Sequence, residues 1–131
     1  MPRETMEIVR EELGLTRSCY ETDDRLKEIS FGDWESFTID ELRSSDPAGV
    51  AAREADKFNF IPPNGESYAQ LLQRVEGWLP SATSDAVVVC HGGILRVLER
   101  LLNGTPANEA AHQLIPQDRL YKWDGDKAVW L

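Results

Sequence analysis

The sequence predicts an α/β sandwich, because strand-type and helix-type patterns alternate along its 131 residues. The main observation is a β-branched run at 87–89 that ends in a His-Gly-Gly turn at 91–93 and passes directly into a helical pattern over 94–102. Two further observations support it: an amphipathic stripe over 68–79 and a hairpin pattern near the C-terminal end. We expect a single domain, 1–131, long enough to bury a real core.

The first half of the chain is predicted to be mostly helical. Apolar residues at helical spacing predict a helix from Arg3 to Leu13, with Gly14 as its stop. The segment from Arg25 to Glu35 mixes aromatic and acidic residues without helical or alternating periodicity, so we expect a loop of the kind that often carries function. Two short helices follow: one opens with a capping-box pattern at Thr38, and the other covers Ala48 to Lys57.

The second half supplies the main helices and the strands. Two prolines and an Asn-Gly pair predict a loop over 58–65. A capping-box pattern opens the next helix at Ser67, and Pro80 ends it. The helix after the His-Gly-Gly turn is predicted to end at Asn103-Gly104. A hairpin around Asp124-Gly125 is expected to join two strands, Arg119 to Trp123 and Lys127 to Leu131.

Composition and charge exclude several classes of partner. The net charge is −9 and the sequence has no Lys/Arg cluster, so we expect neither nucleic acid nor a membrane as a partner. No apolar run reaches the length of a membrane span. The two cysteines, Cys19 and Cys90, lack metal-type spacing and indicate a reduced, cytoplasmic protein. No metal or other cofactor is expected, and a homodimer is left open.

The turn at His91 is the first candidate site. Two glycines allow a sharp turn and let a ligand approach the backbone N–H groups of Gly92 and its neighbour at a helix N-terminus, which suits a phosphate. A histidine at the carboxyl end of a strand stands where open α/β sheets place their ligands. The alternative is an ordinary strand-to-helix turn whose histidine packs or caps.

Glu28 is the second candidate. A carboxylate near an imidazole and an anion-binding helix end would suit phosphoryl transfer, with one group exchanging protons with the leaving oxygen. On spacing alone, a solvated loop carboxylate is the simpler interpretation of Glu28.

Three segments together resemble the histidine phosphatase superfamily, the phosphoglycerate-mutase-like group: Arg25 to Glu35, Gly65 to Ser67 and Val88 to Gly93. The resemblance covers essentially the whole chain and is weak beyond Leu102. It implies a three-layer sandwich with a mostly parallel sheet flanked by helices. It also implies hydrolysis or transfer of the phosphoryl group of a small phosphorylated metabolite through a phosphohistidine.

The resemblance implies a role for each candidate residue. His91 would contact the transferred phosphoryl group and stabilise its charge, and Glu28 would donate a proton to the leaving oxygen. Gly92 would present its backbone N–H near the phosphate. Glu66 would lie at the edge of the site, holding its arginines or a substrate hydroxyl.

The departures from the family pattern concern the nucleophile. The family forms its phosphohistidine in an Arg-His-Gly motif, and this sequence has none; its only other histidine is His112. Met1 stands where the family has a phosphate-binding arginine, and Ser36 stands where it usually has glycine. We therefore expect the family's two opening strands to be missing, the strand at 87–89 to have a free edge, and the chain as given to be inactive. A truncated gene model, a fragment and a genuine loss stay open, as does a non-catalytic remnant that binds phosphate or a partner.

Overall fold

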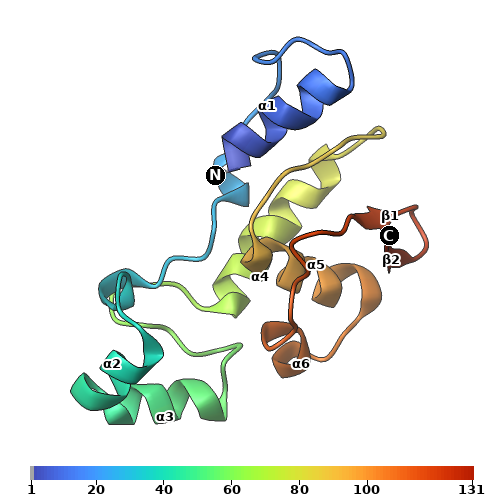
Figure 1. Cartoon of the computed structure of the whole chain (residues 1–131). Coiled ribbons are helices and arrows are strands. Elements are labelled where there is room, and N and C mark those ends of the chain that lie inside the picture. Colours follow the sequence, from blue (N-terminus) through green and yellow to red (C-terminus); the bar gives the residue numbers. More distant parts are fainter. Residues whose placement is uncertain (1) are drawn as a thin grey trace.

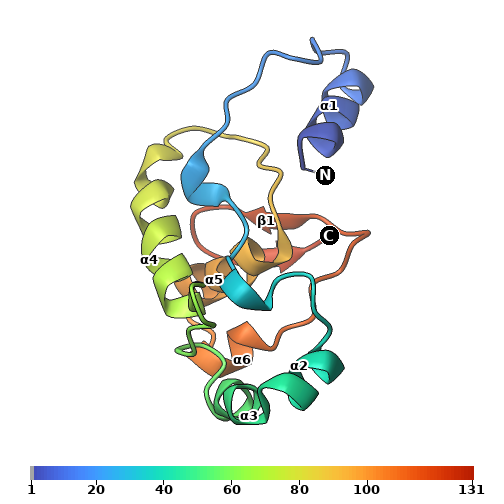
Figure 2. The ribbon, with the colours of Figure 1, turned by 90° about the vertical axis from the view of Figure 1, so that its left-hand side faces the viewer.

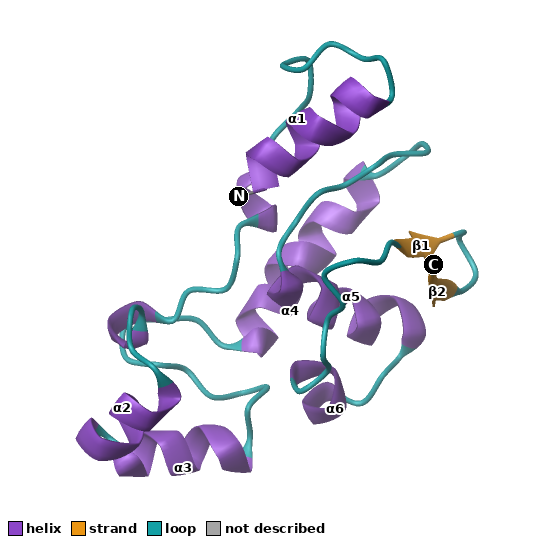
Figure 3. Ribbon diagram, viewed as in Figure 1, coloured by secondary structure: helices purple, strands orange, loops and turns teal. Residues whose placement is uncertain are grey.

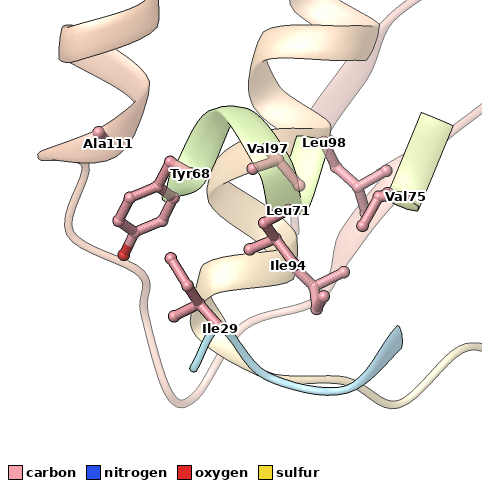
Figure 4. Packing of buried hydrophobic residues seen from close by; sticks show 8 residues of the cluster. All are labelled: Ile29, Tyr68, Leu71, Val75, Ile94, Val97, Leu98 and Ala111. Atoms are coloured by element: carbon pink, nitrogen blue, oxygen red, sulfur yellow. The ribbon is translucent and has the colours of Figure 1, made fainter. Parts of the chain in front are cut away.

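The core of the protein lies between two helices, α4 (Tyr68–Trp78) and α5 (Gly92–Asn103), in a computed structural model that describes residues 2–131. Met1 lies outside the described residues. The largest fully buried side chains come in equal number from α4 (Leu71, Val75) and from α5 (Ile94, Val97). Figure 4 shows these side chains meeting, with Ile29 covering one end of the cluster. Since α5 carries the predicted turn at its start, this core fixes the position of that turn.

The other elements surround this helix pair (Figure 1). The chain opens with a separate helix, α1 (Pro2–Glu12). Short 3-10 turns at Asp24–Leu26, Gly32–Trp34 and Leu79–Ser81 connect the helices. The remaining elements are α2 (Ile39–Ser45), α3 (Pro47–Ala55), α6 (Ala107–Ala111), β1 (Tyr121–Trp123) and β2 (Ala128–Trp130).

The helix boundaries follow the capping signals of the sequence. Thr38 accepts a hydrogen bond from the N–H of Glu41 at the start of α2. At the start of α4, Ser67 and Gln70 form both bonds of a capping box, as predicted. Gly104 ends α5 with φ = 68°, a left-handed conformation that a side chain disfavours.

A second, smaller core supports the loop that carries Glu28. Trp34, Leu42 and Val50 are buried together, from the second 3-10 turn, α2 and α3. The ring of Trp34 also packs against Phe60, with 5.1 Å between ring centroids. The loop predicted over Arg25 to Glu35 is therefore anchored at its far end by an aromatic contact and is not freely solvated.

The prediction of a buried strand at 87–89 is wrong for this structure. The segment is extended, yet Val87 is 63% and Val88 is 41% exposed. Within residues 2–131, the backbone groups of 85–90 form no hydrogen bond with another segment. A β-branched run favours extended backbone, but burial and strand pairing require neighbouring strands.

The mostly parallel sheet is likewise not found among the described residues. The only sheet within 2–131 is the antiparallel pair β1–β2, in which Lys122 faces Val129 (Figure 3). The hairpin prediction is confirmed, because Asp124 and Gly125 form the turn and Gly125 has φ = 93°. The short helix α6, in the segment around His112, was not predicted.

Helix α1 stands apart from the main body, as both ribbon views show (Figures 1 and 2). The predicted helix is present and none of its residues is buried. Its apolar stripe, with Met6 and Val9, borders a hollow of about 980 Å³, as does Leu13 just beyond its end. The segment 86–90, whose backbone is unpaired, comes from a distant part of the sequence and borders the same hollow. The hollow therefore has two apolar walls.

Candidate active site

The structure brings Glu28 to the start of α5. Its Oε2 accepts a hydrogen bond of 3.3 Å from the backbone N–H of Gly93, and its Oε1 accepts one of 2.9 Å from the N–H of Ile29. A carboxylate at a helix N-terminus interacts favourably with the unpaired N–H groups and the helix dipole. Glu28 is therefore not a free, solvated loop carboxylate.

His91 occupies the N-cap position of α5 but does not cap it through its side chain. Its backbone carbonyl accepts from the N–H groups of Ile94 and Leu95, at 3.1 and 3.3 Å. Its side chain forms no capping bond and borders the 980 Å³ hollow. The alternative of a capping histidine is therefore not supported, and within residues 2–131 the imidazole has no hydrogen-bond partner.

The backbone N–H of Gly92 is the open donor of this turn. Within the part of the chain that the structure describes, it has no acceptor, whereas the N–H of Gly93 is bound to Glu28. A side chain at position 92 would lie 3.7 Å from Ile115 and 3.8 Å from the guanidinium of Arg96. The guanidinium of Arg96, one helical turn further along α5, therefore lies close to Gly92 at a helix N-terminus of the kind that suits an anion.

Glu66 is held by an arginine that the sequence did not single out. Arg74 donates to both of its carboxylate oxygens, Nη2 to Oε1 at 2.7 Å and Nε to Oε2 at 3.0 Å. This fork-to-fork pairing is the strongest geometry for an arginine and a carboxylate. Both side chains are about three-quarters buried or more.

The same guanidinium holds the loop that carries Glu28. Arg74 Nη1 donates to the carbonyls of Arg25 and Lys27, both at 2.7 Å, and Nη2 lies 3.4 Å from the carbonyl of Glu28. Glu66 completes the link by accepting from the N–H of Ser30 at 3.3 Å. Arg74 and Glu66 therefore fix the backbone on both sides of Glu28.

A backbone contact between two glycines joins this loop to the loop before α4. Gly32 has φ = 56°, and a side chain there would overlap the carbonyl of Pro63. A side chain on Gly65 would lie 2.9 Å from backbone atoms of Ser30 and Phe31. The hydrogen bond from the N–H of Glu66 to the carbonyl of Ser30, 2.8 Å long, lies beside this contact. Only glycine permits so close an approach at these two positions.

The electrostatic environment of the turn is visible at Cys90. Burial and the neighbouring Glu28 carboxylate raise the pKa of the Cys90 thiol to about 11. A thiol with so high a pKa is a poor nucleophile at neutral pH. Cys90 packs at the edge of the main core, as expected for a small apolar residue.

The four predicted site residues are thus partly gathered. Glu28 reaches the turn of His91 and Gly92, and Glu66 anchors the Glu28 loop without reaching the turn itself. Glu28 and Arg53 both border a different hollow, of about 710 Å³. His112 is exposed, and its Nδ1 lies 2.7 Å from the carbonyl of Asn108, away from this cluster.

Arg53, Arg74 and Arg96 were missed by sequence reasoning. Each partner of Arg74 in the Glu28 loop is a backbone carbonyl 46 to 49 residues away, which no local pattern encodes. Arg96 had a weak signal, because it lies one helical turn after the glycine pair.

Neither a metal site nor a membrane span is found in residues 2–131. No group of three or more His, Cys, Asp or Glu side chains in that range is arranged to bind a metal ion. Every helix of the same range is too short or too polar to cross a bilayer.

Comparison with known proteins finds a matching family model, similar protein sequences and similar solved structures. The family model of the histidine phosphatase superfamily, branch 1, matches residues 2–129. Human 6-phosphofructo-2-kinase/fructose-2,6-bisphosphatase 3 is 33% identical over 108 residues, covering 81% of this chain and 21% of that protein. The bovine form 1 is 36% identical over 90 residues, covering 67% of this chain and 18% of that protein. The chain thus spans about a fifth of the length of these curated relatives.

Solved structures of two bacterial proteins have a similar fold. The alpha-ribazole phosphatase from Shigella flexneri matches with a TM-score of 0.78 and 26% identity, over 97% of this chain and 65% of that one. Bacillus stearothermophilus YhfR matches with a TM-score of 0.73 and 27% identity, over 98% and 66%. The family match covers nearly the whole chain, and the chain belongs to the histidine phosphatase superfamily.

Proposed function

We propose that this chain provides the phosphate-stabilising and proton-donating part of a phosphoryl-transfer site for small phosphorylated metabolites. The observation that carries the proposal is the Glu28 carboxylate at the start of α5, directly beside the His91 turn. Membership of the superfamily supports it, as do the relatives, which include a fructose-2,6-bisphosphatase and an alpha-ribazole phosphatase.

The chemistry proceeds through a phosphohistidine. A histidine nitrogen attacks the phosphorus of the substrate, and the bond from phosphorus to the leaving oxygen breaks. Glu28 donates its proton to that oxygen, and water then cleaves the phosphorus–nitrogen bond to release inorganic phosphate. In a mutase a second hydroxyl takes the place of water. The nucleophile is a histidine that these 131 residues do not contain, so the chain alone turns over little or no substrate.

The other residues stabilise charge. His91 and the N–H of Gly92 are proposed to neutralise the transferred phosphoryl group, as oxyanion-type donors do. Glu66 is proposed to act at the edge of the site through Arg74, which holds the Glu28 loop.

The test compares residues 1–131 with a longer form that includes the upstream reading frame. Both are assayed with p-nitrophenyl phosphate and for an acid-labile phosphohistidine. We expect turnover and phosphohistidine in the longer form only. Substantial turnover by residues 1–131 would show that the nucleophile lies within this chain.

Two variants of the longer form test the assigned roles. His91→Ala and Glu28→Gln should each lower kcat by roughly 10²- to 10⁴-fold, the range for loss of a charge-stabilising or proton-donating group. Unchanged melting temperatures would separate this effect from unfolding. Activity near that of the wild type in either variant removes that residue from the site.

A second candidate function is binding without catalysis. The observation that favours it is the extended segment 86–90, whose unpaired backbone borders the 980 Å³ hollow, because such a segment can accept another strand or a partner. This candidate gains if the upstream reading frame encodes no Arg-His-Gly motif. It fails if the longer form is an active phosphatase whose phosphohistidine forms upstream of Met1.

A further inference from the structure

The extended segment 86–90 combines an unpaired backbone with exposed apolar side chains. It runs toward the start of α5 (Figure 1), and within residues 2–131 its N–H and C=O groups form no hydrogen bond with another segment. Val87 is 63% exposed and Val88 is 41% exposed. An extended segment with free backbone groups and apolar side chains is a ready template for pairing with another strand.

The 980 Å³ hollow beside this segment has the length of one further strand. Two of its walls are the segment itself and the apolar stripe of α1, with Met6 and Val9. Five extended residues span roughly 17 Å, and the 11 residues of α1 span roughly 16 Å. An occupant that contacts both walls along their length is therefore an extended, apolar segment of about five residues.

The sequence of the segment reads almost the same in both directions. Three valines stand at its centre, and a small residue, Ala86 or Cys90, stands at each end. Antiparallel pairing of two copies centred on Val88 therefore places valine opposite valine and Ala86 opposite Cys90, which are favourable cross-strand pairs. Two copies of a chain of net charge −9 repel each other, so a contact without charged residues favours their association.

The residues that flank the segment are also complementary. In the same register, Asp85 of one copy lies opposite His91 of the other, at both ends of the strand pair. The carboxylate can accept a hydrogen bond from the imidazole. In the part of the chain that the structure describes, neither side chain has a hydrogen-bond or ion-pair partner. Any other register separates these two side chains, so the flanking residues specify the register.

We infer that two copies of this chain associate about a two-fold axis at Val88, with their segments 86–90 paired as antiparallel strands. The segment of each copy lies in the hollow of the other, where it covers Met6 and Val9 of α1. The second copy thereby contributes the carboxylate of its Asp85 to the turn at His91. This inference goes beyond the proposed phosphoryl transfer and does not depend on it.

Sedimentation equilibrium of residues 1–131 measures the association. We expect monomer and dimer with no larger species, because a two-fold contact is closed. Val88→Lys places two like charges directly opposite each other and should weaken the dimer by roughly tenfold or more. Val129→Lys is the matched control, because Val129 on β2 is also 41% exposed and the change adds the same charge. It should not weaken the dimer.

The contact between the flanking residues has its own test. Asp85→Asn should weaken the dimer by roughly threefold or more, because a charge-assisted contact is lost at both ends of the strand pair. Asp118→Asn removes the same charge from another exposed position and should not weaken the dimer. Equal effects of the two substitutions would overturn the register.

Cross-linking tests the direction of the pairing. The background variant carries Cys19→Ser and Cys90→Ala, so that the introduced cysteine is the only thiol. A short bis-maleimide should join two copies of the Val88→Cys variant. It should not join two copies of the Ser84→Cys variant, because antiparallel pairing about Val88 separates these positions by roughly 25 Å. Parallel pairing would allow both cross-links.

The opposite results overturn the inference. These are a chain that stays monomeric up to millimolar concentration, an open series of larger oligomers, a loss of dimer in Val129→Lys as large as in Val88→Lys, or a cross-link in Ser84→Cys. If Val88→Lys fails to fold, as judged by circular dichroism, the cross-link at Val88→Cys decides. The phosphatase assay of the longer form is independent of all these results, so the two proposals can fail separately.

Discussion

The N–H of Gly93 donates to Oε2 of Glu28 across 65 residues of sequence, and a side chain at position 93 would overlap the other oxygen of the same carboxylate. Gly93 therefore leaves the room that Glu28 needs, in addition to forming the turn. The second glycine of the His-Gly-Gly turn provides room for a carboxylate, and the first provides the open N–H.

Gly93→Ala should displace Glu28 and lower the free energy of unfolding by about 1–3 kcal/mol, the usual cost of overpacking. The measurement is urea denaturation of residues 1–131. The control is Gly77→Ala, because that glycine lies within α4 and a side chain there meets no atom within 4 Å. Alanine at position 77 should stabilise the protein by about 0.5–1 kcal/mol. Equal effects at the two positions would contradict the contact with Glu28.

Arg74→Gln should lower the free energy of unfolding by about 2–3 kcal/mol, because it leaves the Glu66 carboxylate and several carbonyls without their donor. Amide exchange should accelerate over 25–30. Arg74→Lys should recover only part of the loss, since an ammonium cannot reproduce the fork.

The matched control for Arg74 is Arg17→Gln. Arg17 also pairs with two carboxylates, Glu7 and Glu11, but the arginine is largely exposed to solvent. Its removal should barely change the melting temperature, as for most exposed ion pairs. A loss at Arg17 as large as that at Arg74 would argue against the special role of the Glu66 pair.

The two cysteines should differ sharply in reactivity. Cys19 is exposed, whereas the pKa of Cys90 is raised from 9 to about 11. Iodoacetamide at pH 8, followed by mass spectrometry, should label Cys19 first, because only a thiolate reacts. Faster labelling of Cys90 in the native protein would contradict its burial beside Glu28.

The same thiol predicts a pH dependence of stability. The pKa of Cys90 is higher in the folded state, so its protonated form stabilises the fold fully below about pH 9, and this contribution is lost as the pH rises through about 11. Cys90→Ala should therefore flatten the decline in stability between these values. Urea denaturation at pH 8 and pH 10.5 measures the difference.

Lys57 should titrate near pH 8 in the folded protein. Because this pKa lies below the unfolded value of 10.5, the charged lysine opposes folding, and that opposition fades as the pH rises from about 8 to 10.5. NMR of ¹³C-methylated lysines measures the midpoint, with Lys57→Arg identifying the resonance. A midpoint above 10 would contradict the burial of Lys57 and its proximity to Arg53 and Arg96.

Local signals in the sequence predicted local structure well. The caps at Thr38 and Ser67, the stop at Gly104 and the hairpin around Asp124 depend on residues within a few positions of one another, and all are confirmed. The strand at 87–89 failed because pairing is a property of neighbours and not of the segment itself.

The candidate site was predictable only in part. The residue types at positions 28 and 91 indicated phosphoryl chemistry, and the structure places Glu28 beside the turn. Arg74 escaped prediction because its acceptors include main-chain carbonyls, which every sequence contains. Arg96 escaped because its contact partner, Tyr68, fits the pattern of an ordinary helical core stripe.

The close approach of Gly32 to Pro63 and of Gly65 to Phe31 has a consequence for motion. Two loops in contact backbone to backbone cannot slide past each other, so we expect Glu28 and Glu66 to move together as one rigid unit. We expect the amides of 28–35 and 62–66 to exchange with solvent in a single cooperative opening. Glu28, the proposed proton donor, and Glu66, which anchors its loop, would then be displaced or restored together.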